Sequence, residues 1–253
     1  MATRQRRILT CPHGSAERAT RGSLQIVDAE AASATDVQRL SGGTSTSEIH
    51  DAALSSARPQ LYLTWIDIGA GTGDVLRHIN EAWSPSGLVA VDVLPWLASD
   101  LQEDVELHIG DPVSIAGGLA AADRVLLVET LEHVEAPWTL LRMSARLVKP
   151  GGILVVTTPN IVTLRHRLDL LARAELTSFR PKEPQHLTPV LPHVAELIMR
   201  QEGLMQGPRG YAGRDIVPFT GGRRWPGRLA EFSRPMLNIS LVMAAQRPSV
   251  PRP

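Results

Sequence analysis

A glycine-rich turn in the first half of the chain has the residue types of a ligand cradle. Gly69, Gly71 and Gly73 alternate with other residues directly after an apolar run, and an amphipathic stretch follows them. Glycine has no side chain, so backbone N–H groups in such a turn can approach a ligand closely and adopt positive φ angles. The N-terminus of the following helix would add a partial positive charge. The pattern therefore predicts a strand, a tight turn and a helix that together hold a nucleotide-like ligand.

The spacing of the glycines indicates which ligand the turn holds. A dinucleotide-binding fingerprint has the form G-x-G-x-x-G, whereas this turn has the form G-x-G-x-G and position 74 is Asp74. Asp67 lies two residues before the first glycine. A carboxylate there repels a pyrophosphate but attracts the ammonium group of an amino acid. The turn therefore favours S-adenosylmethionine over NAD.

Three ionisable residues form a second candidate site. Glu129, Glu132 and His133 are spaced i, i+3 and i+4 after another apolar run, which would place them on one side of a helical turn. In one interpretation, His133 is a general base that removes a proton from a hydroxyl group, and the glutamates orient it. In the other, the three groups bind a divalent cation, because carboxylates and imidazole are suitable ligands for such ions.

Alternating strands and helices must position these residues. The apolar segments alternate with amphipathic stretches, an order that predicts right-handed crossovers and a parallel sheet. Ligands of such sheets bind at the carboxyl ends of the strands, where all the candidate residues lie. The expected strands are residues 61–68, 88–91, 105–109, 124–128 and 153–157.

Two further acidic residues follow expected strands. Asp92 ends the second strand, 21 residues after Gly71, at a place where a carboxylate can accept hydrogen bonds from ribose hydroxyls. Asp111 lies in the turn after the third strand, where it either faces a ligand or caps the turn. With these landmarks, residues 61–160 resemble the class I S-adenosylmethionine-dependent methyltransferases.

The resemblance implies an α/β fold, with a Rossmann-like, doubly wound and mostly parallel seven-stranded sheet whose last strand is antiparallel. It also implies that S-adenosylmethionine is the cofactor and that Val93 packs against its adenine. The residues that would contact the cofactor are Asp67, Gly69, Ala70, Gly71, Gly73, Asp92, Val93, Asp111 and Glu129.

The second candidate site resembles that of two metal-using groups within this class. Glu-x-x-Glu-His, the later Thr158-Pro159-Asn160 and a His in a loop before a helix are similar to the ubiquinone-pathway O-methyltransferases and the small-RNA 3′-terminal 2′-O-methyltransferases. The resemblance implies a Mg, Mn or Zn ion held by Glu129, Glu132, His133 and His186. The residues after His186 depart from the RNA enzymes' pattern. His166 is a weaker substitute, expected on the exposed face of its helix.

The rest of the chain is expected to flank or cover this core. The Arg-, Ser- and Gly-containing N-terminus predicts a flexible arm, and a single methyltransferase domain follows it. Helices are expected at 47–57, 161–174 and 194–202. The predicted divisions are 1–46 for the arm, 47–253 for the domain, 61–160 for its cofactor-binding core, 161–235 for substrate-covering elements and 237–245 for the last strand.

Composition limits the function classes. The formal net charge is zero, but residues 61–160 carry 5 basic and 13 acidic residues, whereas residues 200–253 carry 9 arginines and 3 acidic residues. This balance gives no argument for a nucleic-acid partner. Cys11 is the only cysteine, which excludes a disulfide within the chain. No apolar run reaches the roughly 18 residues of a membrane span, so a cytoplasmic protein is expected.

These observations predict an O-methyltransferase that acts on a small hydroxylated molecule, such as a quinone precursor, a sugar or a secondary metabolite, with His133 and Glu132 as catalytic residues. The alternatives are a 3′-terminal RNA 2′-O-methyltransferase and a non-catalytic S-adenosylmethionine-binding or partner subunit. The expected partner is the small-molecule acceptor. The oligomeric state stays open, with a homodimer as one candidate.

Overall fold

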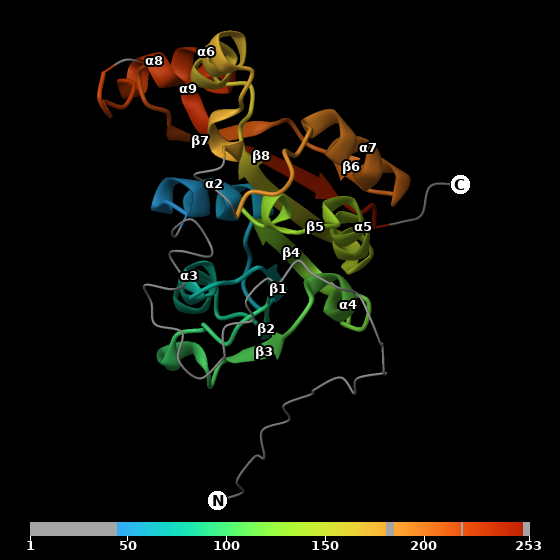
Figure 1. Ribbon diagram of the computed structural model, residues 1–253. Helices are drawn as coiled ribbons and strands as arrows, with labels where there is room; N and C mark the ends of the chain where they lie inside the picture. The colour runs from blue at the N-terminus through green and yellow to red at the C-terminus, as the bar shows by residue number, and fades with distance from the viewer. Residues whose placement is uncertain (1–44, 181–184, 219, 250–253) are drawn as a thin grey trace, which may run out of the picture.

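A mixed sheet forms the centre of the molecule. The computed structural model describes residues 45–180, 185–218 and 220–249 of the 253-residue chain. Its eight-stranded sheet has the order β3-β2-β1-β4-β5-β8-β6, and β7 also pairs with β8 (Figure 1). Most of the predicted N-terminal arm, residues 1–46, lies outside the described residues.

Five parallel strands form the part of the sheet that carries both candidate sites. Val, Ile and Leu dominate these strands, as is typical where helices cover both faces of a sheet. β1 lies in the middle, so that Ile66 pairs with Val89 of β2 on one side and with Val125 of β4 on the other. The predicted parallel strands are confirmed. Their bounds are β1 Thr64–Ile68, β2 Gly87–Asp92, β3 Val105–Ile109, β4 Ala122–Val128 and β5 Val148–Pro159.

Antiparallel strands complete the sheet beyond β5. β8 (Asn238–Gln246) pairs antiparallel with β5 and confirms the predicted antiparallel last strand. The predicted number of seven strands is wrong, because β6 (Met205–Gln206) and β7 (Gly210–Arg214) both pair with the other edge of β8. These two strands are short, and glycine at both ends of the Gly210–Gly213 segment weakens the pattern that would identify a strand.

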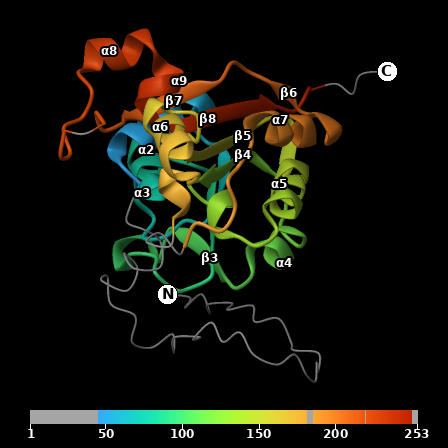
Figure 2. The ribbon, with the colours of Figure 1, turned by 45° about the horizontal axis from the view of Figure 1, so that its top comes forward.

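Helices cover both faces of the parallel strands (Figure 2). Alternate side chains of each strand point to opposite faces, so Trp65 joins the apolar cluster under one pair of helices and Ile66 joins the cluster under the other helices. A proline in the first turn starts α4, α5 and α7, where no N–H donor is needed. The first face carries α2 (Ser47–Ala57) and α3 (Asp74–Trp83), and the second carries α4 (Pro112–Ala116), α5 (Pro137–Arg146) and α7 (Pro192–Gln201).

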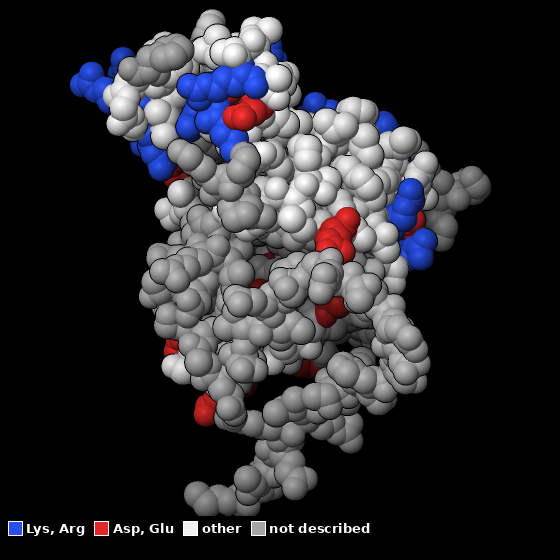
Figure 3. Space-filling view, in the orientation of Figure 1, with Lys and Arg blue, Asp and Glu red and all other residues white. Residues whose placement is uncertain are grey.

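Short helices gather where β5 ends. Asn160 follows β5, and its side-chain amide donates hydrogen bonds to the carbonyl groups of Pro235 and Asn238, which ties this end of the sheet to the C-terminal helices. Figure 3 shows basic side chains gathered over this part of the molecule. The helices are α6 (Leu164–Arg173), α8 (Gly227–Phe232) and α9 (Arg234–Leu237). Within the described residues, single-turn 3-10 helices form at η1 (Ser99–Leu101), η2 (Leu131–His133) and η3 (Thr177–Phe179).

The predicted helices at 47–57, 161–174 and 194–202 are confirmed to within about three residues at each end. Over the described residues, no helix is long and apolar enough to cross a membrane.

Candidate functional site

The glycine turn after β1 has the tight geometry that its sequence predicts. Gly69, Gly71 and Gly73 have φ angles of 80°, 55° and 86°, in the left-handed region that favours glycine. A Cβ atom on Gly69 would lie 2.5 Å from Oγ1 of Thr130, and one on Gly73 would lie 2.6 Å from a methyl group of Leu101. At Gly69 the side chain of Thr130 leaves no room for a Cβ atom, whereas at Gly73 the close atoms are methyl groups of flexible leucines and the left-handed φ is what favours glycine.

Gly71 differs from its neighbours because it faces open space. A Cβ atom at this position would meet no other atom within 4 Å. The amide of Gly71 donates a hydrogen bond of 2.8 Å to Oδ2 of Asp92, the last residue of β2, and the amide of Leu94 donates one of 3.3 Å to Oδ1. The turn and the end of β2 thus form a cradle with one open glycine and one acidic side.

Asp67 supplies a buried and incompletely paired carboxylate beside this cradle. Its residue is 2% exposed, and its Oδ1 has no hydrogen-bond partner. Burial, together with the nearby negative charge of Asp92, raises the pKa of Asp67 to about 7. Burial also raises the pKa of Asp92, against the effect of its backbone hydrogen bonds. A cationic ligand would favour the ionised forms of these two carboxyl groups, whose pKa values are raised without it.

The other residues predicted to contact a cofactor differ in their surroundings. Ala70 lies in the turn, where its amide donates a hydrogen bond to the carbonyl of Val91. Val93 is 56% exposed, so its side chain is accessible to a ligand. Asp111 caps α4, because its carboxylate accepts hydrogen bonds from the amides of Val113 and Ser114. This observation favours the capping interpretation of Asp111.

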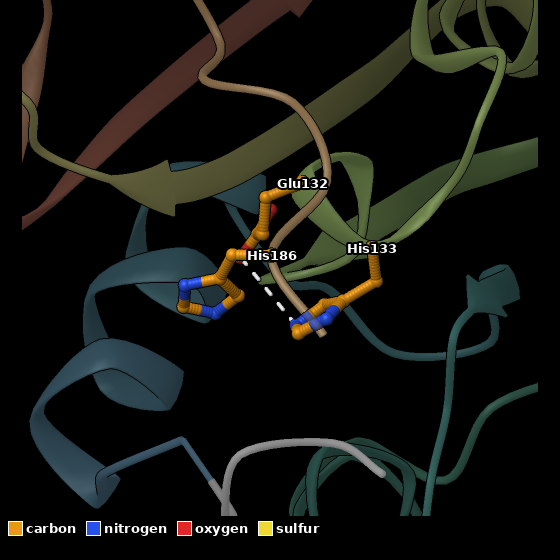
Figure 4. Close-up of side chains that lie close together, drawn as sticks. All are labelled: Glu132, His133 and His186. Atoms are coloured by element: carbon orange, nitrogen blue, oxygen red, sulfur yellow. Dashed lines mark ion pairs between the residues drawn. The ribbon is translucent and has the colours of Figure 1, made fainter. Parts of the chain in front are cut away.

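The second candidate site brings together three of the four predicted metal ligands (Figure 4). Glu132, His133 and His186 each offer one ligand atom, and these atoms all lie within 4.8 Å of one another. Glu132 and His133 come from η2, directly after β4, and His186 comes from the loop before α7. The backbone holds the two segments together, because the amides of Leu187 and Thr188 donate hydrogen bonds to the carbonyl of Glu132.

Glu132 is a fully buried acidic residue. Its side chain is 0% exposed, one carboxylate oxygen has no hydrogen-bond partner, and the other accepts a hydrogen bond of 3.4 Å from Thr158. Burial, reinforced by the neighbouring Glu129, raises the pKa of Glu132 well above its usual range. A buried carboxylate is costly unless it is protonated, paired or bound to a metal.

Both histidines use one ring nitrogen to bind a backbone carbonyl. Nδ1 of His133 lies 3.0 Å from the carbonyl oxygen of Gln185, and Nδ1 of His186 lies 2.5 Å from that of Ser178. A carbonyl only accepts, so each ring carries its proton on Nδ1 and keeps the Nε2 lone pair for a ligand. Nε2 of His133 lies 3.9 Å from Oε1 of Glu132. Burial and the adjacent His186 lower the pKa of His133 to about 4.

Glu129 lies outside this cluster. The predicted spacing on one helical turn is wrong for this residue, since Glu129 has a left-handed φ of 49° and only residues 131–133 form the 3-10 turn. Its Oε1 instead accepts hydrogen bonds from the hydroxyls of Thr157 in β5 and Ser240 in β8. Burial raises the pKa of Glu129. Sequence spacing gives no sign of either partner, because both come from other strands.

The predicted position of His166 on the exposed face of its helix is wrong. Its residue is only 6% exposed, and it contacts Thr163 and Ser178 instead of solvent. No sequence pattern identifies Ser178, because its contact to the site is made by a backbone carbonyl that any residue possesses. A serine among Thr, Phe and Arg gives no signal for that role.

The sequence that forms this sheet and its two candidate sites matches a known protein family. Residues 29–204 match the methyltransferase domain family. The chain belongs to this family. Its parallel sheet, its glycine turn after β1 and its acidic residue at the end of β2 are thus those of a methyltransferase domain.

Individual relatives of this methyltransferase domain are distant. A ubiquinone biosynthesis O-methyltransferase of Maricaulis maris is 31% identical over 135 residues, which are 51% of this chain and 53% of the relative. One of Xanthomonas oryzae is 28% identical over 130 residues, 48% of this chain and 53% of the relative. The chain spans about half the length of the curated relatives it matches. A SAM-dependent methyltransferase structure from Archaeoglobus fulgidus matches with a TM-score of 0.55 and 14% identity, over 78% of this chain and 90% of that chain, which supports the fold alone.

The family implies S-adenosylmethionine as the cofactor, and the glycine turn fits it. This cofactor has an ammonium group, a ribose and a sulfonium. The unpaired Oδ1 of Asp67 offers a buried acceptor for a cationic group, and the open space at Gly71 lets a ligand reach the backbone. The methyltransferase fold therefore carries a cradle whose charge and shape suit this cofactor.

Proposed function

We propose that this methyltransferase domain transfers a methyl group from S-adenosylmethionine to the oxygen of a small hydroxylated acceptor. The observation that carries the proposal is the buried carboxylate of Glu132 beside the two Nε2 lone pairs of His133 and His186, at the carboxyl end of β4. The names of the ubiquinone-pathway relatives support oxygen as the acceptor atom. Because the chain spans only about half of those relatives, their substrate is not carried over.

The cofactor would be held by the turn after β1 and the end of β2. Asp67 would bind its ammonium group, Asp92 would accept hydrogen bonds from its ribose, and the open side of Gly71 would face it. When bound, the cofactor supplies a methyl group on a positively charged sulfur. Methyl transfer then depends mainly on the placement of the acceptor, so a rigid site contributes much of the rate.

The low pKa of His133 favours a cation-binding role over that of a general base. A base with a pKa of about 4 accepts a proton from a hydroxyl group poorly at neutral pH, because the best general bases titrate near the working pH. The same low pKa keeps the ring neutral and its Nε2 lone pair available. We therefore assign Glu132, His133 and His186 as ligands of a divalent cation (Mg, Mn or Zn), which when bound would lower the pKa of an acceptor hydroxyl.

Glu129 would act from outside this ligand set. Its carboxylate is held by Thr157 and Ser240, and its negative charge lies close enough to raise the pKa of Glu132. A cation at the cluster would relieve this repulsion. Glu129 thus adds to the negative potential at the site without binding the ion directly.

The experiment measures cofactor binding, cation binding and turnover on the same metal-free protein. S-adenosylhomocysteine is titrated by calorimetry and Mn²⁺ by electron paramagnetic resonance. Methyl transfer is assayed with 3,4-dihydroxybenzoate as a catechol probe and with a short RNA carrying a free 3′ end. We expect Glu132→Gln and His186→Ala to weaken Mn²⁺ binding at least about tenfold and to leave S-adenosylhomocysteine affinity within about threefold. The matched control is Glu135→Gln, since Glu135 is an exposed acid in the same loop.

Each part of the proposal has its own contradicting result. Failure of the wild-type protein to bind S-adenosylhomocysteine would refute the cofactor assignment. Turnover that survives both chelation and His186→Ala would refute the cation, and methylation of the RNA but not of the catechol would refute the small acceptor.

A further inference from the structure

His166 is a buried histidine whose two ring nitrogens both have partners. It lies in the first turns of α6, and its residue is 6% exposed. Nδ1 lies 2.9 Å from Oγ1 of Thr163, the N-cap residue of the same helix. Nε2 lies 3.3 Å from the amide nitrogen of Ser178 and 3.2 Å from its hydroxyl. The ring therefore joins the start of α6 to η3.

The amide of Ser178 fixes the tautomer of His166. An amide N–H only donates, so Nε2 of His166 accepts, and the ring proton lies on Nδ1, where it is donated to Thr163. The opposite end of the same residue serves the proposed cation site, because the carbonyl of Ser178 accepts the Nδ1 proton of His186. Ser178 thus receives support from His166 on one side and orients His186 on the other.

Ion pairing strengthens this attachment of η3 to α6. Asp169, one turn after His166 on α6, accepts a hydrogen bond from the hydroxyl of Thr177 and forms an ion pair of 2.8 Å with Arg180. Thr177 and Arg180 flank Ser178 on both sides. The segment around Ser178 is therefore attached to α6 at three residues, 177, 178 and 180, and the contact of the middle one is made with His166.

We propose that His166 is a positioning residue that acts on His186 through the backbone of Ser178. It holds His186 with its proton on Nδ1, so that the Nε2 lone pair can bind the same cation as Glu132 and His133. His166 does not belong to the cluster of ligand atoms at the proposed cation site. Its effect on cation binding rests on the proposed function, whereas its effect on the tautomer of His186 does not. Outer partners that orient a ligating histidine typically change metal affinity about 10–100-fold when they are removed.

A histidine that only fills space in the interior would behave differently. Phenylalanine has a similar ring and would fill the same volume, but it offers no acceptor for the Ser178 amide. Glutamine loses the ring but supplies a carbonyl oxygen that can accept the same N–H. If hydrogen bonding is what matters, His166→Gln retains function better than His166→Phe, and if volume matters the order is reversed.

The test compares the full chain with His166→Phe, His166→Gln and the control His193→Phe. His193 is an exposed histidine on α7, so it undergoes the same chemical change without a buried hydrogen bond. Nitrogen-15 NMR of histidine-labelled protein reports which ring nitrogen of His186 carries the proton, and a His186→Gln spectrum assigns the signal. Electron paramagnetic resonance measures Mn²⁺ affinity, and calorimetry measures S-adenosylhomocysteine affinity.

We expect His186 to carry its proton on Nδ1 in the wild-type protein and to become a mixture of tautomers in His166→Phe. We expect Mn²⁺ affinity to fall about 10–100-fold in that variant, to recover mostly in His166→Gln and to stay unchanged in His193→Phe. S-adenosylhomocysteine affinity should stay within about threefold in all variants that fold.

Two outcomes would overturn the inference: a wild-type His186 with its proton on Nε2, or a folded His166→Phe variant with unchanged tautomer and unchanged Mn²⁺ affinity. The first needs no variant, so the inference remains testable if His166→Phe does not fold. A protein that shows the expected tautomers but binds no Mn²⁺ would instead refute the proposed cation site and leave the positioning role of His166 in place.

Discussion

The cofactor cradle and the proposed cation site both lie at the carboxyl ends of the parallel strands. The residues that contact each other in the two sites are separated by very different distances in the sequence. In the cradle, the hydrogen bond between Gly71 and Asp92 joins residues 21 positions apart. In the cation site, His133 reaches Gln185 over 52 positions, and just outside the ligand set Glu129 reaches Ser240 over 111. The first site is nearly complete in one βαβ unit, whereas the second needs two more strands and a loop in place.

The buried acidic residues of the two regions have different neighbours. Asp67 and Glu132 each have a carboxylate oxygen without a hydrogen-bond partner. Asp67 lies near a second acid and beside an open turn, which suits an extended organic cation. Glu132 lies beside two imidazole rings in a compact cluster, which suits a small metal ion. The same unpaired group therefore indicates two different cations, because its neighbours differ.

The contact between Gly69 and Thr130 joins the two regions, and breaking it should have the largest effect. Gly69→Ala combines a left-handed backbone, which costs about 1–2 kcal/mol, with an overlap against Thr130 that costs about 1–3 kcal/mol. We expect the free energy of unfolding to fall by about 2–5 kcal/mol in denaturant titrations. Mn²⁺ affinity should also fall, since Thr130 precedes η2.

Gly71→Ala is the matched control for this prediction. It has the same kind of backbone strain but no overlap, so we expect it to lose only about 1–2 kcal/mol of stability. Its new methyl group points into the open cradle, and S-adenosylhomocysteine affinity should fall about tenfold or more, about 1.4 kcal/mol. Equal stability of the two variants would show that Thr130 does not constrain the turn.

The raised pKa of Asp67 predicts that pH affects the cradle. An ammonium ligand needs the ionised carboxylate, so S-adenosylhomocysteine affinity should rise about tenfold per pH unit below pH 7 and level off above it. Calorimetry between pH 5.5 and 7.5 keeps the ligand's amino group protonated.

Without a ligand, a rise in pH has the opposite effect on the stability of the protein. A folded-state pKa raised from 3.8 to about 7 contributes stability below pH 4, and this contribution is lost as the pH rises to 7. Asp67→Asn is the control, because it removes the titrating group from a similar shape and should flatten both pH profiles. An affinity profile that keeps its slope in Asp67→Asn would assign the titration to another group.

The same contrast in sequence distance explains what could be predicted from the sequence. The strands around Ile66 and Val125 are visible as apolar runs, and the glycine turn is contiguous, so the sequence predicts both elements. The departure of Glu129 from the helical turn depends on hydroxyls from β5 and β8, which no local pattern reveals. The burial of His166 likewise depends on η3 folding back onto α6.

The smallest expected effect comes from Asp111, which lies beside the cradle but caps the start of α4. Its variants test where the cofactor cradle ends. Its carboxylate accepts hydrogen bonds from two amides and from the hydroxyl of Ser114, and these bonds lower its pKa. We expect Asp111→Ala to lose about 1 kcal/mol of unfolding free energy, the usual cost of an N-cap, and Asp111→Asn to lose less. Thermal unfolding measures both changes. S-adenosylhomocysteine affinity should change less than about threefold in either variant, since a carboxylate already occupied by the start of α4 has little capacity left for a ligand. A larger loss of affinity with unchanged stability would assign Asp111 to the adenine and extend the cradle as far as β3.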